Sequence, residues 1–134
     1  IMRFLIVIIL SVTILSFSCR NSEHVTAENA RKGEALFNSV GCKQCHSVTG
    51  DTVLYGPSLN SIFKKEVVVL RGEKKLTLTI DREYILRSIT DPEKEKPDGF
   101  GNKKMLPVNL TPDEIGFLAD YLIYISGGQQ LKNP

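Results

Sequence analysis

Two cysteines and a histidine lie close together in the first half of the chain. Residues 42–46 read Cys-Lys-Gln-Cys-His, a C-x-x-C-H sequence. This pattern is typical of c-type haem attachment, in which two thiols add to the haem vinyl groups and the adjacent imidazole binds iron. Two intervening residues in a turn of helix place both sulfurs on one side, and the histidine follows without a further loop. We therefore predict that Cys42, Cys45 and His46 hold one covalent haem c.

Paired cysteines also occur in redox dithiols and in zinc sites. A thioredoxin-like dithiol would follow a strand in a βαβ pattern, and no such pattern precedes Cys42. Zinc would need a second cysteine or histidine pair, whereas the chain has three cysteines and two histidines in all. Both alternatives are therefore less favoured than haem.

A haem iron with two axial ligands needs a second donor besides His46. The candidates beyond the N-terminal apolar run are Met105 and His24. Met105 follows a lysine pair in a polar loop and precedes Pro107, whereas His24 lies in a polar N-terminal stretch. We predict Met105 as the second ligand, because a thioether with an imidazole raises the reduction potential and closes the iron to oxygen.

The third cysteine lies directly behind an apolar segment. Residues 4–15 contain only two polar side chains, and Arg3 precedes them. This run is shorter than the roughly 20 residues of a membrane-spanning helix but fits the core of an export signal. We predict a lipoprotein-type signal at 1–18, a lipid anchor on Cys19 and a tether at 19–25. The alternative is a plain secretory signal, since Leu15 stands four places before Cys19 rather than the usual three.

The remaining chain has the composition of one soluble domain, assigned here to residues 26–134. The whole chain is 42% hydrophobic and 24% charged, and its 17 basic side chains nearly balance its 15 acidic ones. A balance this even produces no strong field, so nucleic acid is not an expected partner.

Three helices and a hairpin should position the motif residues. Helices are predicted over 27–39, over 82–89 and from Pro112 to Ile125, each opened by a capping residue. The largely apolar run at 66–70 and the alternating run at 76–80 predict a short hairpin with its turn at 71–73. Residues 93–104 are predicted as a charged loop. Gly33 is costly inside a helix, which indicates a close crossing with the last helix, where Tyr121 would pack over Gly33 and Phe37.

Taken together, these stretches resemble class I c-type cytochromes. The closest likeness is to the cytochrome c domain at the C-terminus of some bacterial cytochrome c oxidase subunit II chains. It extends from about Gly33 to Ile125 and is carried by the following stretches: residues 33–37, 41–46, 56–59, the hairpin, 81–92, 105–107 and the last helix. The oxidase subunit also carries a copper-binding domain, for which this chain has neither the length nor the ligands. The chain also lacks tryptophan, which mitochondrial relatives use near a propionate.

The resemblance implies an all-α cytochrome c fold in which the N- and C-terminal helices cross, with haem-binding loops and a short β-hairpin insertion. It implies that the Pro57 carbonyl accepts a hydrogen bond from the ring of His46. It also makes Tyr55, Tyr84 and Arg87 candidates for contacts to the haem propionates.

The function expected from these features is electron carriage rather than catalysis. We expect a monohaem cytochrome on the periplasmic side of a bacterial membrane, lipid-anchored or soluble, passing single electrons between redox proteins of a respiratory chain. A cytochrome oxidase is one candidate partner, and no small-molecule substrate is expected. The alternatives are a subunit of a larger oxidase, reductase or dehydrogenase, and a haem sensor or peroxidase, which Met105 disfavours.

Overall fold

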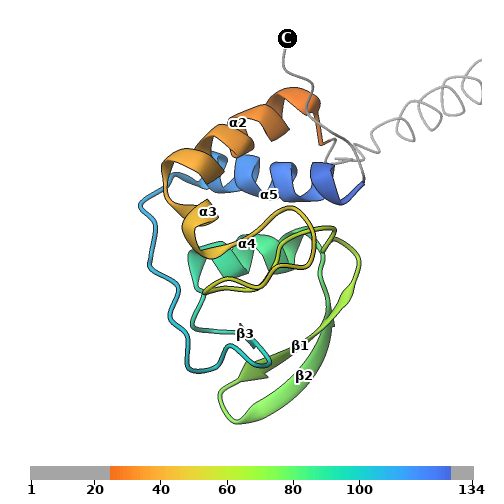
Figure 1. Ribbon diagram of the computed structural model, residues 1–134, viewed down its shortest axis with the longest axis vertical. Helices are drawn as coiled ribbons and strands as arrows, with labels where there is room; N and C mark the ends of the chain where they lie inside the picture. Colours follow the sequence, from red (N-terminus) through yellow and green to blue (C-terminus); the bar gives the residue numbers. More distant parts are fainter. Residues whose placement is uncertain (1–24, 128–134) are drawn as a thin grey trace, which may run out of the picture.

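The computed structural model describes residues 25–127. Within this range no helix is long and apolar enough to span a bilayer. The expected signal, Cys19 and His24 lie outside the described residues. The elements in chain order are α2 (Ala27–Ser39), α3 (Cys42–Cys45), β1 (Glu66–Arg71), β2 (Lys74–Thr79), α4 (Arg82–Thr90), β3 (Lys96–Pro97) and α5 (Pro112–Ser126) (Figure 1).

The first and last described helices, α2 and α5, cross at Gly33. A Cβ atom there would overlap the backbone oxygen of Phe117 and lie 2.7 Å from the Cβ atom of Tyr121. The rings of Phe37 and Tyr121 pack beside this point with centroids 5.6 Å apart. The predicted crossing is therefore confirmed, since only glycine lets the two backbones approach so closely.

Both crossing helices begin at the capping residues predicted from the sequence. The Thr26 hydroxyl accepts a hydrogen bond from the Asn29 N–H at 3.1 Å, which fixes the start of α2. At α5 the Thr111 hydroxyl accepts from the Glu114 N–H, and the Glu114 carboxylate accepts from the Thr111 N–H. This reciprocal pair satisfies two amide groups that would otherwise lack partners, and it fixes where α5 begins.

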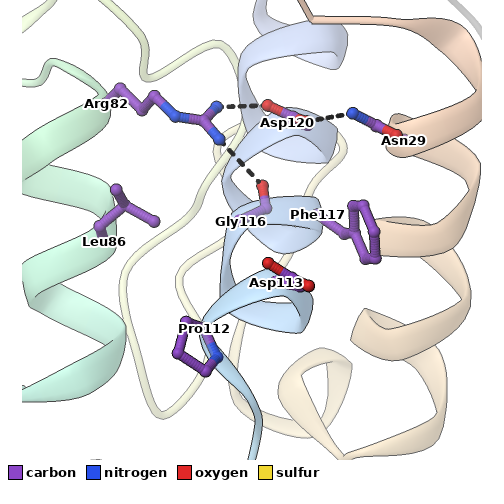
Figure 2. Close-up of a pocket in the computed structure, with 8 residues that line it drawn as sticks. All are labelled: Asn29, Arg82, Leu86, Pro112, Asp113, Gly116, Phe117 and Asp120. Carbon is purple, nitrogen blue, oxygen red and sulfur yellow. Dashed lines mark hydrogen bonds and ion pairs between the residues drawn. The ribbon is translucent and has the colours of Figure 1, made fainter. Parts of the chain in front are cut away.

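Helix α4 is held against α5 by a buried ion pair. Arg82 at the start of α4 contacts the Asp120 carboxylate, which also accepts a hydrogen bond from the Asn29 side chain at 3.1 Å. Figure 2 shows Asp120 between these two partners. One carboxylate on α5 thus joins three helices, and burial of Asp120 is tolerated because both of its oxygens are paired.

The sheet differs from the expected hairpin in two ways. Its turn has two residues rather than three, because Arg71 pairs with Lys74 and Gly72 adopts the positive φ of 60° that a tight turn requires. A third strand, β3, pairs with β1 inside the expected charged loop, giving the order β2-β1-β3. The fold therefore has four helices and a three-stranded sheet in residues 25–127, so the expected all-α fold with only a hairpin is wrong in this detail.

The core joins the helices to the first strand. Val69 is fully buried although its neighbour Val68 is exposed, so β1 presents alternate residues to the interior. The other buried members of the cluster are Phe37, Ile80, Tyr84, Ile85, Leu118, Ala119, Tyr121 and Leu122. Several of these side chains also form one wall of a large cavity.

Candidate functional site

A cavity of about 690 Å³ opens beside the core. Its lining comes from all four described helices, from β1 and β3, and from the loops that follow α3 and β3. The walls are mostly apolar, with Phe37, Val40, Leu59, Ile62, Val67, Ile80, Ile85, Ile89, Phe100, Leu106, Val108, Leu118 and Leu122 among the lining residues. A cavity of this size and lining is typical of sites for organic cofactors.

The C-x-x-C-H motif forms a single helical turn at this cavity. Gly41 precedes α3 with a φ of 92°, and the His46 N–H closes the turn on the Cys42 carbonyl at 3.0 Å. Cys42, Cys45 and His46 are half-buried, and all three line the cavity. Both thiols are free, and burial raises the pKa of the Cys42 thiol. The two sulfurs are therefore available to the same apolar space.

The His46 ring is fixed from the loop that follows it. Its Nδ1 atom donates a hydrogen bond to the Pro57 carbonyl at 2.9 Å, the contact that the resemblance implied. Because a carbonyl only accepts, this bond leaves Nε2 with its lone pair free to bind a metal. The ring also lies directly on Gly56, where a Cβ atom would be 2.8 Å from Nδ1 and 3.0 Å from Nε2.

Met105 reaches the same cavity from the loop between β3 and α5. Its side chain is half-buried and lines the cavity together with His46. The loop is held just before this residue by the Lys96 ammonium, which donates to the carbonyls of Lys103 at 2.8 Å and Gly101 at 3.3 Å. The structure thus gathers a thioether and an imidazole, 59 positions apart in the sequence, around one space.

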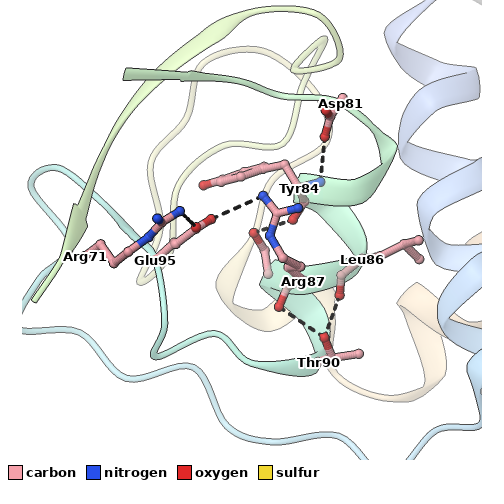
Figure 3. Close-up of polar contacts among 8 residues, drawn as sticks. Arg71, Asp81, Tyr84, Leu86, Arg87, Thr90 and Glu95 are labelled. Carbon is pink, nitrogen blue, oxygen red and sulfur yellow. Dashed lines mark hydrogen bonds and ion pairs between the residues drawn. The ribbon is translucent and has the colours of Figure 1, made fainter. Parts of the chain in front are cut away.

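The sequence did not indicate a buried carboxylate in the cavity wall. Glu95 lies in the expected charged loop but is almost fully buried, and it pairs with Arg71 and Arg87 (Figure 3). Burial by itself would raise the pKa of Glu95, but hydrogen bonds and attraction from the two arginines outweigh it and lower the pKa. No local signal distinguishes Glu95 from its solvated neighbours, because its partners come from β1 and α4.

The three candidate propionate contacts have different surroundings. The Tyr55 hydroxyl accepts a hydrogen bond from the Lys104 N–H, and Arg87 pairs with Glu95 at 3.5 Å. The Tyr84 ring is buried, and burial raises the pKa of its hydroxyl. Tyr55 and Tyr84 line the cavity, whereas Arg87 does not.

The residues at the cavity fit a haem better than a simple metal ion. In residues 25–127 no group of three or more His, Cys, Asp or Glu side chains is arranged to hold a metal ion, so the zinc alternative is not supported there. Nor does any strand precede the motif in that range, as a thioredoxin-like arrangement would require. The cavity instead combines apolar walls with two thiols, an oriented imidazole and a thioether.

Comparisons with known proteins agree with this chemistry. The family model described as cytochrome c matches residues 30–126. A solved structure, a cytochrome c from Rhodothermus marinus, is similar with a TM-score of 0.55 and 22% identity, covering 81% of this chain and 85% of that one. Curated protein sequences give no significant match. Because the family model spans most of the chain, this protein belongs to the cytochrome c family, whose members bind haem c covalently and transfer electrons.

Proposed function

We propose that this protein is a monohaem c-type cytochrome with histidine and methionine axial ligands. Cys42 and Cys45 form the thioether links, and His46 and Met105 bind the iron. The observation that carries the proposal is the single cavity that these four side chains line. It accounts for the two half-buried thiols, the oriented imidazole and the methionine in a polar loop.

The haem iron supplies the one-electron couple, and the chain supplies its environment. Pro57 orients the imidazole through Nδ1, so Nε2 keeps one direction in both redox states. Met105 would be the second protein ligand, and its thioether would favour the reduced iron and disfavour binding of oxygen or peroxide. The apolar walls would limit the access of water to the haem. This combination suits electron carriage rather than oxygen chemistry.

We further propose that the carrier works outside the cytoplasm, between redox proteins of a respiratory chain. The support is in the sequence: an export-type signal at 1–18, Cys19 directly behind it, a tether at 19–25 and the haem domain at 26–134. A lipid on Cys19 would hold the protein at the membrane surface near its partners. The likeness to an oxidase subunit domain favours a second candidate, a subunit of a larger oxidase, reductase or dehydrogenase. Proteins that co-purify from native membranes distinguish the two.

Replacing the methionine tests the axial ligands. Oxidised protein should show the weak near-infrared band of sulfur-to-iron charge transfer. Met105→Ala should lose that band, lower the reduction potential and let carbon monoxide bind the reduced iron. Asn109→Ala is the matched control, because Asn109 lies on the same loop, is exposed and does not line the cavity. Rapid carbon monoxide binding by the unaltered protein would favour the sensor or peroxidase alternative.

The anchor is tested at the mature N-terminus. Mass spectrometry should find acyl chains on Cys19. Cys19→Ser should either retain the signal or release a soluble cytochrome with an unchanged spectrum. An unmodified terminus downstream of Cys19 would refute the anchor and leave the haem assignment intact.

A further inference from the structure

We infer that Tyr55 is a positioning residue that holds the Met105 loop in place at the mouth of the cavity. Its hydroxyl accepts a hydrogen bond from the Lys104 N–H at 3.3 Å. The Lys103 ammonium lies 4.8 Å from the centroid of its ring, within the range of a cation–π contact. Both contacts are made to the two residues immediately before Met105. This inference rests on the proposed ligation by Met105.

The same short segment holds the histidine. Tyr55 immediately precedes Gly56 and Pro57, and the Pro57 carbonyl accepts the hydrogen bond from His46. The Gly56 N–H, in turn, donates to the Cys45 carbonyl at 2.8 Å. Residues 55–57 therefore contact both the segment that carries His46 and the loop that carries Met105. A movement of either one changes the contacts of residues 55–57.

Tyr55 provides the hydrogen bond nearest to the methionine. Lys96 binds carbonyls earlier in the loop, at Gly101 and Lys103. After the Lys104 N–H, the next hydrogen bond recorded along the described chain is at Thr111, where α5 is capped. Within the described residues, positions 105–110 make no hydrogen bond that would hold Met105 directly. Loss of the Tyr55 contact would leave Lys96 as the last polar attachment before the methionine.

The contact also explains an exposed tyrosine at the cavity mouth. Tyr55 is 48% exposed, so its ring contributes little to the core, yet its hydroxyl, its ring face and its backbone neighbours are all engaged. A residue that served only stability would change the unfolding free energy when altered. A positioning residue should instead change how often the thioether leaves the iron.

The experiment measures carbon monoxide binding to the reduced holoprotein, because carbon monoxide enters only when Met105 dissociates. Tyr55→Phe keeps the ring and removes the hydroxyl. One lost hydrogen bond should speed carbon monoxide binding about 2- to 12-fold, with a weaker near-infrared band. Tyr124→Phe is the matched control, because Tyr124 lies on α5 and does not line the cavity. It should leave the rate and the band unchanged.

A second pair of variants tests the contact between the Lys103 ammonium and the Tyr55 ring. These variants still test the role of Tyr55 if Tyr55→Phe accumulates no holoprotein. Lys103→Gln removes the cation over the ring and should speed carbon monoxide binding about 2-fold. Lys103→Arg keeps a cation and should restore the original rate.

The outcomes separate this inference from the proposed function. If the unaltered protein lacks the near-infrared band and binds carbon monoxide rapidly, Met105 is not the ligand and both fail. If the unaltered protein has the band while Tyr55→Phe and Lys103→Gln bind carbon monoxide at the original rate, the ligation stands and the role of Tyr55 is overturned.

Discussion

The helix crossing and the cavity solve the problem of burying apolar surface in opposite ways. At the crossing, Ala30 and Ala119 are fully buried, and Gly33 brings two backbones into contact, so amino-acid side chains fill the space. At the cavity, comparable apolar side chains surround about 690 Å³ that they do not fill. The comparison teaches that one half of the core is complete as polypeptide, whereas the other is completed by its cofactor.

The buried carboxylates of the two regions differ in how exposed their arginine partners are. At the crossing, Asp120 and Arg82 are both largely buried, with the Arg82 side chain 17% exposed. At the cavity, Glu95 is buried, but its two arginine partners are 50% and 42% exposed. The first pair joins helices inside the core, and the second joins the cavity wall to the surface.

Removing the cofactor should have the largest effect. At about 24 cal/mol per Å³, a dry cavity of 690 Å³ corresponds to about 17 kcal/mol, an upper bound because the cavity opens to water. This matches or exceeds the whole stability of a typical domain, about 5–15 kcal/mol. Cys42→Ala with Cys45→Ala should therefore give haem-free chain with little helix by circular dichroism. Cys19→Ser, which keeps both haem cysteines, is the control. Cooperative unfolding of the haem-free chain would contradict the comparison.

Filling the close contact at the crossing should have the next largest effect. Gly33→Ala should lower the free energy of unfolding by about 3 kcal/mol, because its methyl group meets backbone that cannot move aside. The near-infrared band should persist. Gly116→Ala is the matched control on α5, since its Cβ atom would lie 3.7 Å from the nearest Arg82 nitrogen, and it should be neutral or stabilising by up to about 1 kcal/mol. Equal stability of the two variants would show that the crossing can relax.

A glycine-to-alanine change at the cavity, Gly56→Ala, should alter the reduction potential more than the stability of the fold. In Gly56→Ala the new methyl group would meet the His46 ring, which must tilt or shift to relieve the contact at a cost of about 1–2 kcal/mol. The shift should change the reduction potential and the visible spectrum, which Gly33→Ala should leave unaltered. Potentiometry of both variants provides the measurement. An unchanged potential in Gly56→Ala would mean that Pro57 alone orients the ring.

Neutralising Glu95 should have the smallest effect and a distinct pH dependence. Its pKa is lowered in the folded state, so its stabilisation is complete above the unfolded pKa near 4.5 and is lost as the pH falls through the folded value. Glu95→Gln should cost about 1 kcal/mol at pH 7, since its partners are half exposed. The gap to the original protein should shrink below about pH 4. Glu93→Gln, which breaks an ion pair with Lys96, is the control.

A gap that stays constant between pH 7 and pH 3 in chemical denaturation would show that the Glu95 charge contributes nothing and that only its packing matters.

Local signals predicted most of the helical region. The capping residues Thr26, Asp81 and Thr111 each accept the expected amide hydrogen bond, and α4 runs one residue beyond its predicted end. The attachment motif is likewise local, because its chemistry depends on adjacent residues. The contact at Gly33 could be predicted because a glycine inside a helix is destabilising and therefore indicates a close approach of another backbone.

Long-range pairings could not be predicted in the same way. Strand β3 has two residues and no pattern of its own, and it exists because β1 offers a free edge. The burial of Glu95 depends on arginines from two other elements, and the Tyr55 hydroxyl meets a backbone amide 49 positions away. The cavity itself left no sequence signal beyond its motif, because its apolar lining residues read as ordinary core.

The two crossing helices also set an order of assembly. Helix α2 has 13 residues, a length at which an isolated helix is marginal, and its partner α5 comes last among the described elements. The haem-attachment residues directly follow α2, so they are made before the helix that packs against α2. We therefore expect Cys42 and Cys45 to be accessible to haem before α5 docks, and the cavity to be completed afterwards.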